Sequence, residues 1–487
     1  MTLDLKNTDL LKTQAYINGQ WLDGDAKETF DVLNPATGDV LASVASLGAN
    51  ETRRAIEAAH AALPAWQKKT AKERAQLLRR WFDLIMANQE DLARIMTLEQ
   101  GKPLAESRGE IAYGASFIEW FSEEGKRVYG DVIPGPNDRR LIAIKQAVGV
   151  VAAITPWNFP SAMLARKAGP ALAAGCTFII KPAKETPLSA LALVELAEQV
   201  GIPAGVINAV VSKDSRSIGA ELTQNPLVRK LSFTGSTPVG KQLLKQSADT
   251  LKKVSMELGG NAPVIVFEDA DLDLAVAGAI ASKYRNAGQT CICANRLLVQ
   301  ENIAQAFTEK FTAAVNQLHV GNGLDDSVAL GPLINRQALE DVDAMVQDAI
   351  DRGALATTGG QAPDNSGAFY PPTVLTNVTD TMRVFREEIF GPVAPIFTFT
   401  DEADAIQQAN DTEFGLASYF YTQNMSRAWR VAEALDYGMV GVNEVAITSE
   451  TIPFGGVKES GMGREGSKYG MDDYLEIKYI CMGGLTP

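Results

Sequence analysis

The sequence predicts an α/β protein built on parallel, doubly wound sheets. From Val148 onward, short runs of β-branched and apolar residues alternate with helical segments long enough to serve as crossover connections. A second region of the same kind follows Gly260, and a detached alternating stretch, DYLEIKYICMGG, ends the sequence. A chain of 487 residues has room for about two or three domains.

The first ~140 residues are mostly helical by pattern, because apolar residues recur at three- and four-residue spacing over 50–63, 70–98 and 103–123, with NQE (88–90) and TLEQGKP (97–103) as breaks. Residues 137–147, NDRRLIAIKQA, predict an extended strand with polar flanks. This strand and the C-terminal stretch are candidate subunit contacts, since exposed edge strands invite pairing.

Each alternating region contains several strand-helix units. In the first, the strands are VGVVAAITPW, CTFIIKP, GVINAVV and RKLSFTGS, and the helices are 161–174, 187–200 and 215–224. In the second, the strands lie near PVIVF, NRLLVQ, VAPIFTF, ASYFYT and GMVGVN, and the helices are 271–285, 301–317 and 335–352. Ligands collect at the carboxyl ends of strands in such sheets. TPWN, IIKPAK, FTGS and MELGG all follow strands and are therefore predicted to share one site.

Composition excludes several classes of function. A net charge of −14 would repel nucleic acid. No apolar run approaches the ~20 residues that span a membrane, and MTLDLKNTDLLKTQ lacks the blocks of a secretory signal. Four cysteines make no disulfide framework and predict the reducing cytoplasm. The two histidines, His60 and His319, have no ligand or nucleophile pattern nearby, so neither a metal site nor a Ser-His-Asp triad is predicted.

Two glycine-rich motifs resemble the sequence fingerprints of nucleotide-binding sites. GMGREG (461–466) matches G-x-G-x-x-G but follows a loop-like segment, so a glycine-rich loop without a nucleotide role is expected. GSTPVGK (235–241) is nearly a P-loop, but Gln242 replaces the hydroxyl that would hold Mg²⁺. Its place between a strand and a helix suits a cofactor phosphate. An ordinary Ser/Thr-capped turn is the alternative.

Three stretches carry candidate chemistry. Glu257 ends a strand before two glycines, and it is either a general base or a solvent-facing turn residue. Asn158 lies in TPWNFP, where two prolines would hold it as a fixed amide donor or where it only forms a turn. In NAGQTCICANR, Cys291 and Cys293 could be half of a metal site, a redox pair, a nucleophile with a neighbour, or core. A lone C-x-C falls short of a four-ligand metal site.

The motifs TPWNFP, KPAKETP, FTGST, MELGGN, GQTC and EEIFGPV occur in the order, and at about the spacing, of the NAD(P)-dependent aldehyde dehydrogenases. The chain resembles this family over nearly its whole length. It is similar to the succinate-semialdehyde dehydrogenase branch through ARKAGPALAAG, KYRNAGQTCICANR, PFGGVKESGMGREGSKYG and DYLEIKY. The resemblance implies a Rossmann-like cofactor-binding domain (1–128 and 148–259), an α/β catalytic domain (260–456) and a small β extension for bridging and oligomerisation (129–147 and 457–487).

The resemblance also implies a mechanism. Cys291 matches the nucleophile, whose thiolate adds to an aldehyde to give a thiohemiacetal; a hydride then leaves for the nicotinamide, and water cleaves the thioester. The Asn158 amide and the Cys291 backbone N–H match the oxyanion hole, and Glu257 matches the residue that activates water. A reversible Cys291–Cys293 disulfide, as proposed for relatives with this pair, is an open second role. It needs a flexible loop, because side chains at i and i+2 on a regular strand lie too far apart.

The cofactor contacts follow from the same motifs. Lys181 matches the residue that contacts the adenosine ribose. Gly235 and Ser236 match the turn that binds the pyrophosphate, with Trp157 beside it, and Glu388 and Phe390 match the residues that hold the nicotinamide half. The expected lining is completed by Thr155, Pro156, Ala183 and Leu258. Many NAD-preferring members have Glu where this chain has Lys184. An ammonium would attract a 2′-phosphate, so NADP⁺ is the expected cofactor, while the adjoining Glu185 leaves NAD⁺ use open.

The branch binds the distal carboxylate of its substrate through two arginines and a hydroxyl. These carry over to Arg166, Arg285 and Ser449, with Thr448 as the alternative hydroxyl. The predicted reaction is oxidation of succinate semialdehyde to succinate, and a longer ω-carboxy semialdehyde such as glutarate semialdehyde is the alternative. Glu257 argues against transfer of the thioester to coenzyme A, and the retained catalytic set argues against a non-enzymatic scaffold. Family members are commonly homodimers or homotetramers joined through strands like 473–481.

Overall fold

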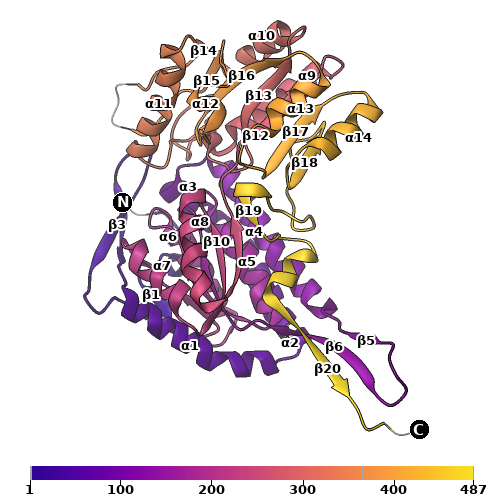
Figure 1. Ribbon diagram of the computed structural model, residues 1–487. Coiled ribbons are helices and arrows are strands. Elements are labelled where there is room, and N and C mark those ends of the chain that lie inside the picture. The colour runs from indigo at the N-terminus through magenta and orange to yellow at the C-terminus, as the bar shows by residue number, and fades with distance from the viewer. Residues whose placement is uncertain (1–2, 364–366, 486–487) are drawn as a thin grey trace.

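The computed structural model describes residues 3–363 and 367–485 (Figure 1). These residues form two large sheets of mostly parallel strands, a three-stranded antiparallel sheet and a two-stranded ribbon. The α/β class predicted from the alternating pattern is confirmed. Among the helices described, none combines the length and apolar character needed to cross a membrane.

The first large sheet has the order β19-β11-β10-β7-β8-β9-β1-β2, and β7 to β11 are its parallel part. Its strands are β1 (Ala15–Ile17), β2 (Gln20–Leu22), β7 (Val150–Ile154), β8 (Thr177–Lys181), β9 (Ile207–Ala209), β10 (Val228–Thr234), β11 (Lys253–Glu257) and β19 (Gly461–Met462). Its crossover helices are α5 (Pro160–Ala174), α6 (Pro187–Gln199), α7 (Ser215–Gln224) and α8 (Thr237–Ser247). The chain winds outward from β7 to β9, then returns to β10 on the other side of β7. The crevice between the ends of β7 and β10 is therefore the switch point where ligands bind.

The N-terminal part supplies helices that pack on this sheet. They are α1 (Ala49–Lys68), α2 (Ala71–Ala87), α3 (Gln89–Gln100) and α4 (Leu104–Glu124), and β3 (Thr29–Leu33) pairs with β4 (Val40–Ala45). One sequence-based expectation needs correction. Strands β1 to β4 occupy a part of the chain that was expected to be mostly helical. The break expected at NQE (88–90) is confirmed, because Asn88 ends α2 and begins α3.

The second large sheet has the order β14-β15-β16-β13-β12-β17-β18 and is parallel except for β14. Its strands are β12 (Ala262–Val266), β13 (Ala294–Gln300), β14 (Leu355–Thr358), β15 (Thr373–Thr376), β16 (Val393–Phe399), β17 (Ala417–Tyr421) and β18 (Met439–Val442). Its helices are α9 (Leu272–Tyr284), α10 (Ala304–Val315), α11 (Arg336–Asp351), α12 (Arg383–Arg386), α13 (Glu402–Asn410) and α14 (Met425–Ala434). Its buried strands are continuous apolar runs, as expected when helices cover both faces.

Two hydrophobic cores correspond to the two sheets. The chain passes from the first core to the second at 258–261 and returns at 455–461. Because β11 ends where β12 is about to begin, the carboxyl edge of the first sheet faces the amino edge of the second. The two crossings are bonded to each other: the Leu258 N–H donates to the Ser460 carbonyl at 2.9 Å, and Ser460 Oγ donates to the Gly259 carbonyl at 2.7 Å.

The small antiparallel sheet has the order β20-β6-β5 and projects from the body of the molecule (Figure 1). It consists of β5 (Asp131–Ile133), β6 (Arg140–Ala147) and β20 (Leu475–Met482). The two detached strands expected from the sequence are confirmed, and they pair with each other along their full length. Ile477 is 74% exposed and Tyr479 60% exposed, so an apolar edge faces outward. The three-domain division and the subunit contact stay predictions.

Candidate active site

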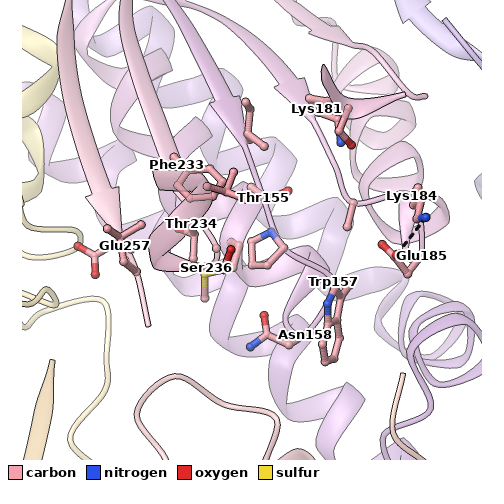
Figure 2. A pocket seen from close by; sticks show the side chains of 18 of the residues that line it. Thr155, Trp157, Asn158, Lys181, Lys184, Glu185, Phe233, Thr234, Ser236 and Glu257 are labelled. Carbon is pink, nitrogen blue, oxygen red and sulfur yellow. Dashed lines mark ion pairs between the residues drawn. The ribbon is translucent and has the colours of Figure 1, made fainter. Parts of the chain in front are cut away.

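A cavity of about 950 Å³ lies at the carboxyl edge of the first sheet, at the switch point between β7 and β10 (Figure 2). Segments that follow five strands of the first sheet line it, together with three residues of the second half. Every residue predicted to be catalytic or to contact the cofactor lies on its wall: Thr155, Pro156, Trp157, Asn158, Lys181, Ala183, Lys184, Gly235, Ser236, Glu257, Leu258, Cys291, Glu388 and Phe390. Arg166, Arg285 and Ser449 are not part of this wall.

The wall contains polar groups that suit a dinucleotide. The helix α8 begins at Thr237, and the side chain of its N-cap, Ser236, makes no capping hydrogen bond. The hydroxyls of Thr155 and Thr234 are buried without a hydrogen-bond partner among the described residues. Free N–H groups at a helix N-terminus suit a phosphate, and buried hydroxyls need a partner. The residues present therefore fit a bound NAD(P).

The far end of the cavity is basic. Lys184 lines it with Lys213 and Arg216, which sequence reasoning missed because they follow β9 in a segment without a motif. The Lys184 side chain is 55% exposed, and its Nζ lies 3.9 Å from Glu185 Oε1. Burial lowers the pKa of Lys181 to about 8, although the Glu185 carboxylate opposes this shift.

Asn158 joins the two halves of the molecule at the inner end. It follows β7, and its Nδ2 donates to the Gln289 carbonyl at 3.0 Å, two residues before Cys291. An amide nitrogen carries two hydrogens, so one remains for a ligand. Beside it, the ring of Trp157 meets the edge of Phe390 with 5.6 Å between centroids.

Cys291 lies in a turn between α9 and β13. The preceding residues Asn286 and Ala287 adopt left-handed conformations with φ of 51° and 54°, which cost about 1–3 kcal/mol each for such residues. The Ile292 carbonyl accepts from Tyr419 Oη at 2.8 Å, and this bond holds the turn. Burial raises the pKa of the Cys291 thiol, the Glu388 carboxylate adds to the shift, and Arg166 opposes it.

Cys293 points away from the cavity. It is buried, and its Sγ donates to the Gly288 carbonyl at 3.2 Å. Both cysteines of the pair are free thiols in this structure. A disulfide between them would break the Cys293 hydrogen bond and disturb the turn that Tyr419 holds.

The two glycines after Glu257 are explained by close packing. A Cβ on Gly260 would lie 2.3 Å from the Cys291 carbonyl oxygen, and one on Gly259 would lie 2.7 Å from Glu388 Oε2. The Gly260 N–H donates to Glu388 Oε1 at 3.0 Å. Burial raises the pKa of Glu388 to about 7, although this N–H opposes the shift. The glycines thus bring the nucleophile turn and a carboxyl group together.

Glu257 is buried, and neither of its carboxylate oxygens has a hydrogen-bond partner among the described residues. Burial raises the pKa of Glu257 well above its ordinary value, and Glu465 adds to this shift, while Arg166 and Lys167 oppose it. A carboxyl group with free oxygens at the wall of a cavity can receive a proton from water.

Glu465 and Lys167 are further residues that sequence reasoning missed. Lys167 Nζ lies 2.5 Å from Glu465 Oε1, and Arg166 Nε lies 2.9 Å from Oε2. Glu465 belongs to GMGREG, the motif for which no nucleotide role was expected. The glycine pattern hid this residue of the loop, and no local signal distinguishes that Glu from a surface one.

The three residues predicted to bind the substrate carboxylate lie outside the cavity wall. Arg166 is buried on α5 between the rings of Phe117 and Phe454, and its Nη2 has no hydrogen-bond partner among the described residues. Arg285 lies over the ring of Phe159, a wall residue, at 5.1 Å. Ser449 contacts Thr451, with their hydroxyl oxygens 2.7 Å apart.

A switch-point cavity that ends on a thiol and a buried carboxyl group suits a dinucleotide-dependent enzyme. Comparison with known proteins gives the family. The aldehyde dehydrogenase family profile matches residues 21–480, and the chain belongs to this family. It is an NAD(P)-dependent enzyme that acts on an aldehyde.

Similar proteins cover the whole chain. The succinate-semialdehyde dehydrogenase [NADP(+)] of Escherichia coli is 62% identical, with 99% of this chain and 100% of the relative aligned. A glutarate-semialdehyde dehydrogenase of Pseudomonas putida is also 62% identical over 99% of this chain and 100% of its own length. A crystal structure titled as an E. coli NADP-dependent enzyme superimposes with a TM-score of 0.98 at 61% identity, covering 99% of this chain and 100% of that one.

Proposed function

We propose that this protein oxidises succinate semialdehyde to succinate with NADP⁺ as the preferred cofactor. The observation that supports this most is a buried arginine, Arg166, with a free Nη2. Burial lowers its pKa, but the charges of Tyr113 and Glu465, with smaller contributions from Glu257 and Cys291, raise it overall, which places the guanidinium near both proposed catalytic groups. A guanidinium in this place can hold a carboxylate at the far end of a short aldehyde. Arg285 and Ser449 are the proposed further contacts.

The chemistry proceeds in two halves on one cysteine. Cys291 Sγ loses its proton and attacks the aldehyde carbon, and the developing oxyanion receives hydrogen bonds from Asn158 Nδ2 and the Cys291 N–H. A dinucleotide bound in this cavity would supply the acceptor for the hydride that leaves this carbon. Glu257 then takes a proton from a water molecule that attacks the thioester, and Cys291 leaves as a thiolate. Glu388, with a pKa of about 7, is a group near Cys291 that can accept its proton.

The cofactor preference rests on charge at the outer end of the cavity. Lys184, Lys213 and Arg216 line that end, and three cations there favour a ligand with an additional phosphate. Glu185 and Asp214 also line the cavity; these carboxylates moderate the field and leave room for NAD⁺.

A substrate with one more methylene, glutarate semialdehyde, is the second candidate, because relatives of equal similarity carry either name. A single methylene changes discrimination by only about 10–200-fold.

The test is kcat/KM across semialdehydes of three to six carbons and their uncharged analogues. Succinate semialdehyde should exceed butanal by at least about 100-fold, since hydrogen bonds to a charged group contribute about 1.5–3 kcal/mol each. Arg285→Ala should remove most of this advantage while butanal turnover stays constant. Equal kcat/KM for butanal and succinate semialdehyde would rule out the carboxylate site, and a maximum at five carbons would favour the second candidate.

We further propose a cytoplasmic homodimer or homotetramer in which the outer edge of the β20-β6-β5 sheet meets another subunit. The apolar residues exposed on β20 and four free cysteines support this assignment. We also propose the division into cofactor, catalytic and bridging domains described for the family.

A further inference from the structure

Three side chains near the start of α4, spaced four residues apart, face the reacting centre. They are Lys102, which lies just before the N-cap Pro103, and Glu106 and Glu110, whose four-residue spacing places them on one side of α4. Each one contacts a segment that carries a proposed catalytic group. None of the three was selected by a sequence motif.

Lys102 and Glu110 hold the backbone on both sides of Phe159. Lys102 Nζ donates to the Asn158 carbonyl at 2.7 Å and lies 2.6 Å from Glu110 Oε2. Glu110 Oε1 accepts from the N–H groups of Ser161 and Ala162 at 3.0 and 3.2 Å. The helix α5 has no side-chain cap of its own, so Glu110 caps it from a distance.

Glu106 holds the other catalytic segment. Its carboxylate accepts from the Asn286 N–H at 2.9 Å, in the left-handed stretch that leads to Cys291. Asn286 Nδ2 in turn donates to the Asn158 carbonyl at 3.2 Å. One helix therefore fixes the segment that carries the Asn158 amide and the turn that carries Cys291.

The Lys102–Glu110 pair is completely enclosed, with 1% and 2% exposure. A buried ion pair is weak evidence for stability, because well-packed apolar residues often replace such a pair without loss. Here the ammonium has three partners, since it also lies 3.9 Å from the centroid of the Phe159 ring. Two of the three belong to the segment 158–159 on the cavity wall.

We propose that Lys102 is a positioning residue for aldehyde oxidation: with Glu110, it fixes the Asn158 amide at the place where the oxyanion forms. This inference rests on the proposed function only for the use of Cys291 and Asn158, and is independent of which aldehyde is the substrate. Lys102 acts through Asn158 and does not touch the reacting atoms.

The test is a double-mutant cycle on single-turnover cofactor reduction, measured with whichever aldehyde the wild-type enzyme turns over fastest. Lys102→Met should slow this step about 10–100-fold, and Asn158→Ala about 10²–10³-fold. The double variant should be no slower than Asn158→Ala alone, because a misplaced amide matters only while the amide is present. Losses that multiply in the double variant would overturn the proposal.

Two controls separate positioning from general damage. Lys252→Met removes another buried ammonium, whose Nζ donates to the Asn225 carbonyl away from the cavity, and should leave the single-turnover rate within twofold. The rate of Cys291 alkylation by iodoacetamide should stay within twofold in Lys102→Met, because this reaction forms no oxyanion. A tenfold loss of alkylation would show a displaced nucleophile and overturn the proposal.

If Lys102→Met does not fold, Glu110→Gln serves the same cycle. It keeps an oxygen acceptor for α5 and removes the negative partner of Lys102. A rate loss of about threefold or more that disappears in the Asn158→Ala background supports the proposal, and an unchanged rate overturns it. Absence of selectivity for carboxylated aldehydes in the wild-type enzyme would refute the proposed substrate and leave this result intact.

Discussion

The two ends of the catalytic region are built in different ways. The cofactor end is formed by consecutive strand ends of one sheet, so its residues occur in short motifs that follow strands. The proposed carboxylate end would combine Arg166 from α5, Arg285 from the end of α9 and Ser449 from the segment after β18. Topology therefore specifies the first end, whereas side chains from distant elements would specify the second. Changes at the two ends should have separable effects.

The largest difference between an effect on turnover and an effect on cofactor binding is expected at Cys291, the thiol between the two ends. Cys291→Ala should lower turnover by at least about 10⁴-fold, as loss of a nucleophile does, while NADP⁺ affinity stays within twofold because strand ends of the first sheet form that site. Turnover and cofactor titration measure the two effects. Substantial remaining oxidation would refute the nucleophile assignment.

Glu257→Gln should leave hydride transfer intact and slow the thioester hydrolysis that follows it. The variant should reduce about one cofactor per active site in a burst and then turn over about 10²–10⁴-fold more slowly, because only thioester hydrolysis needs the base. Wild-type turnover should rise with pH through a range above the ordinary carboxyl pKa, since burial raises the pKa values of Glu257 and Cys291 and keeps both groups protonated at low pH. Absence of the burst would show that a step before or at hydride transfer is blocked. That result would contradict a role for Glu257 in hydrolysis alone.

Lys184→Glu should alter the cofactor end alone. Reversing a half-exposed charge should lower the NADP⁺/NAD⁺ ratio of kcat/KM by about tenfold, with no change in the KM for the aldehyde. Lys184→Gln is the matched control and should give a smaller decrease. An unchanged ratio in both variants would indicate that Lys213 and Arg216, and not Lys184, determine the cofactor preference.

The smallest effect on turnover is expected for Cys293→Ala, because this thiol lies behind the wall. After peroxide treatment, dithiothreitol should restore the wild-type enzyme more fully than the variant, since a Cys291–Cys293 disulfide would protect Cys291 from further oxidation. Equal recovery of both proteins would exclude the redox switch.

The same contrast explains how much the sequence could predict. Strand ends could be read from apolar runs, and the motifs after them identified the wall from Thr155 to Phe390. Long-range partners could not be read in this way: Glu465 reaches Lys167 across 298 positions, and Lys102 reaches Asn158 across 56. Strands β1 to β4 escaped detection because they are short, and only some of their residues are buried.

The bonds between the two chain crossings have a consequence for motion. Leu258, Gly259 and Ser460 tie both connections together, and Gly260 packs against the Cys291 carbonyl. A hinge needs residues whose backbone dihedral angles are free to change, and these are not. The two halves should therefore stay closed throughout turnover. The cofactor should then enter and leave lengthwise through the mouth of the cavity, and the charges proposed to select it should also affect the rate of its exchange.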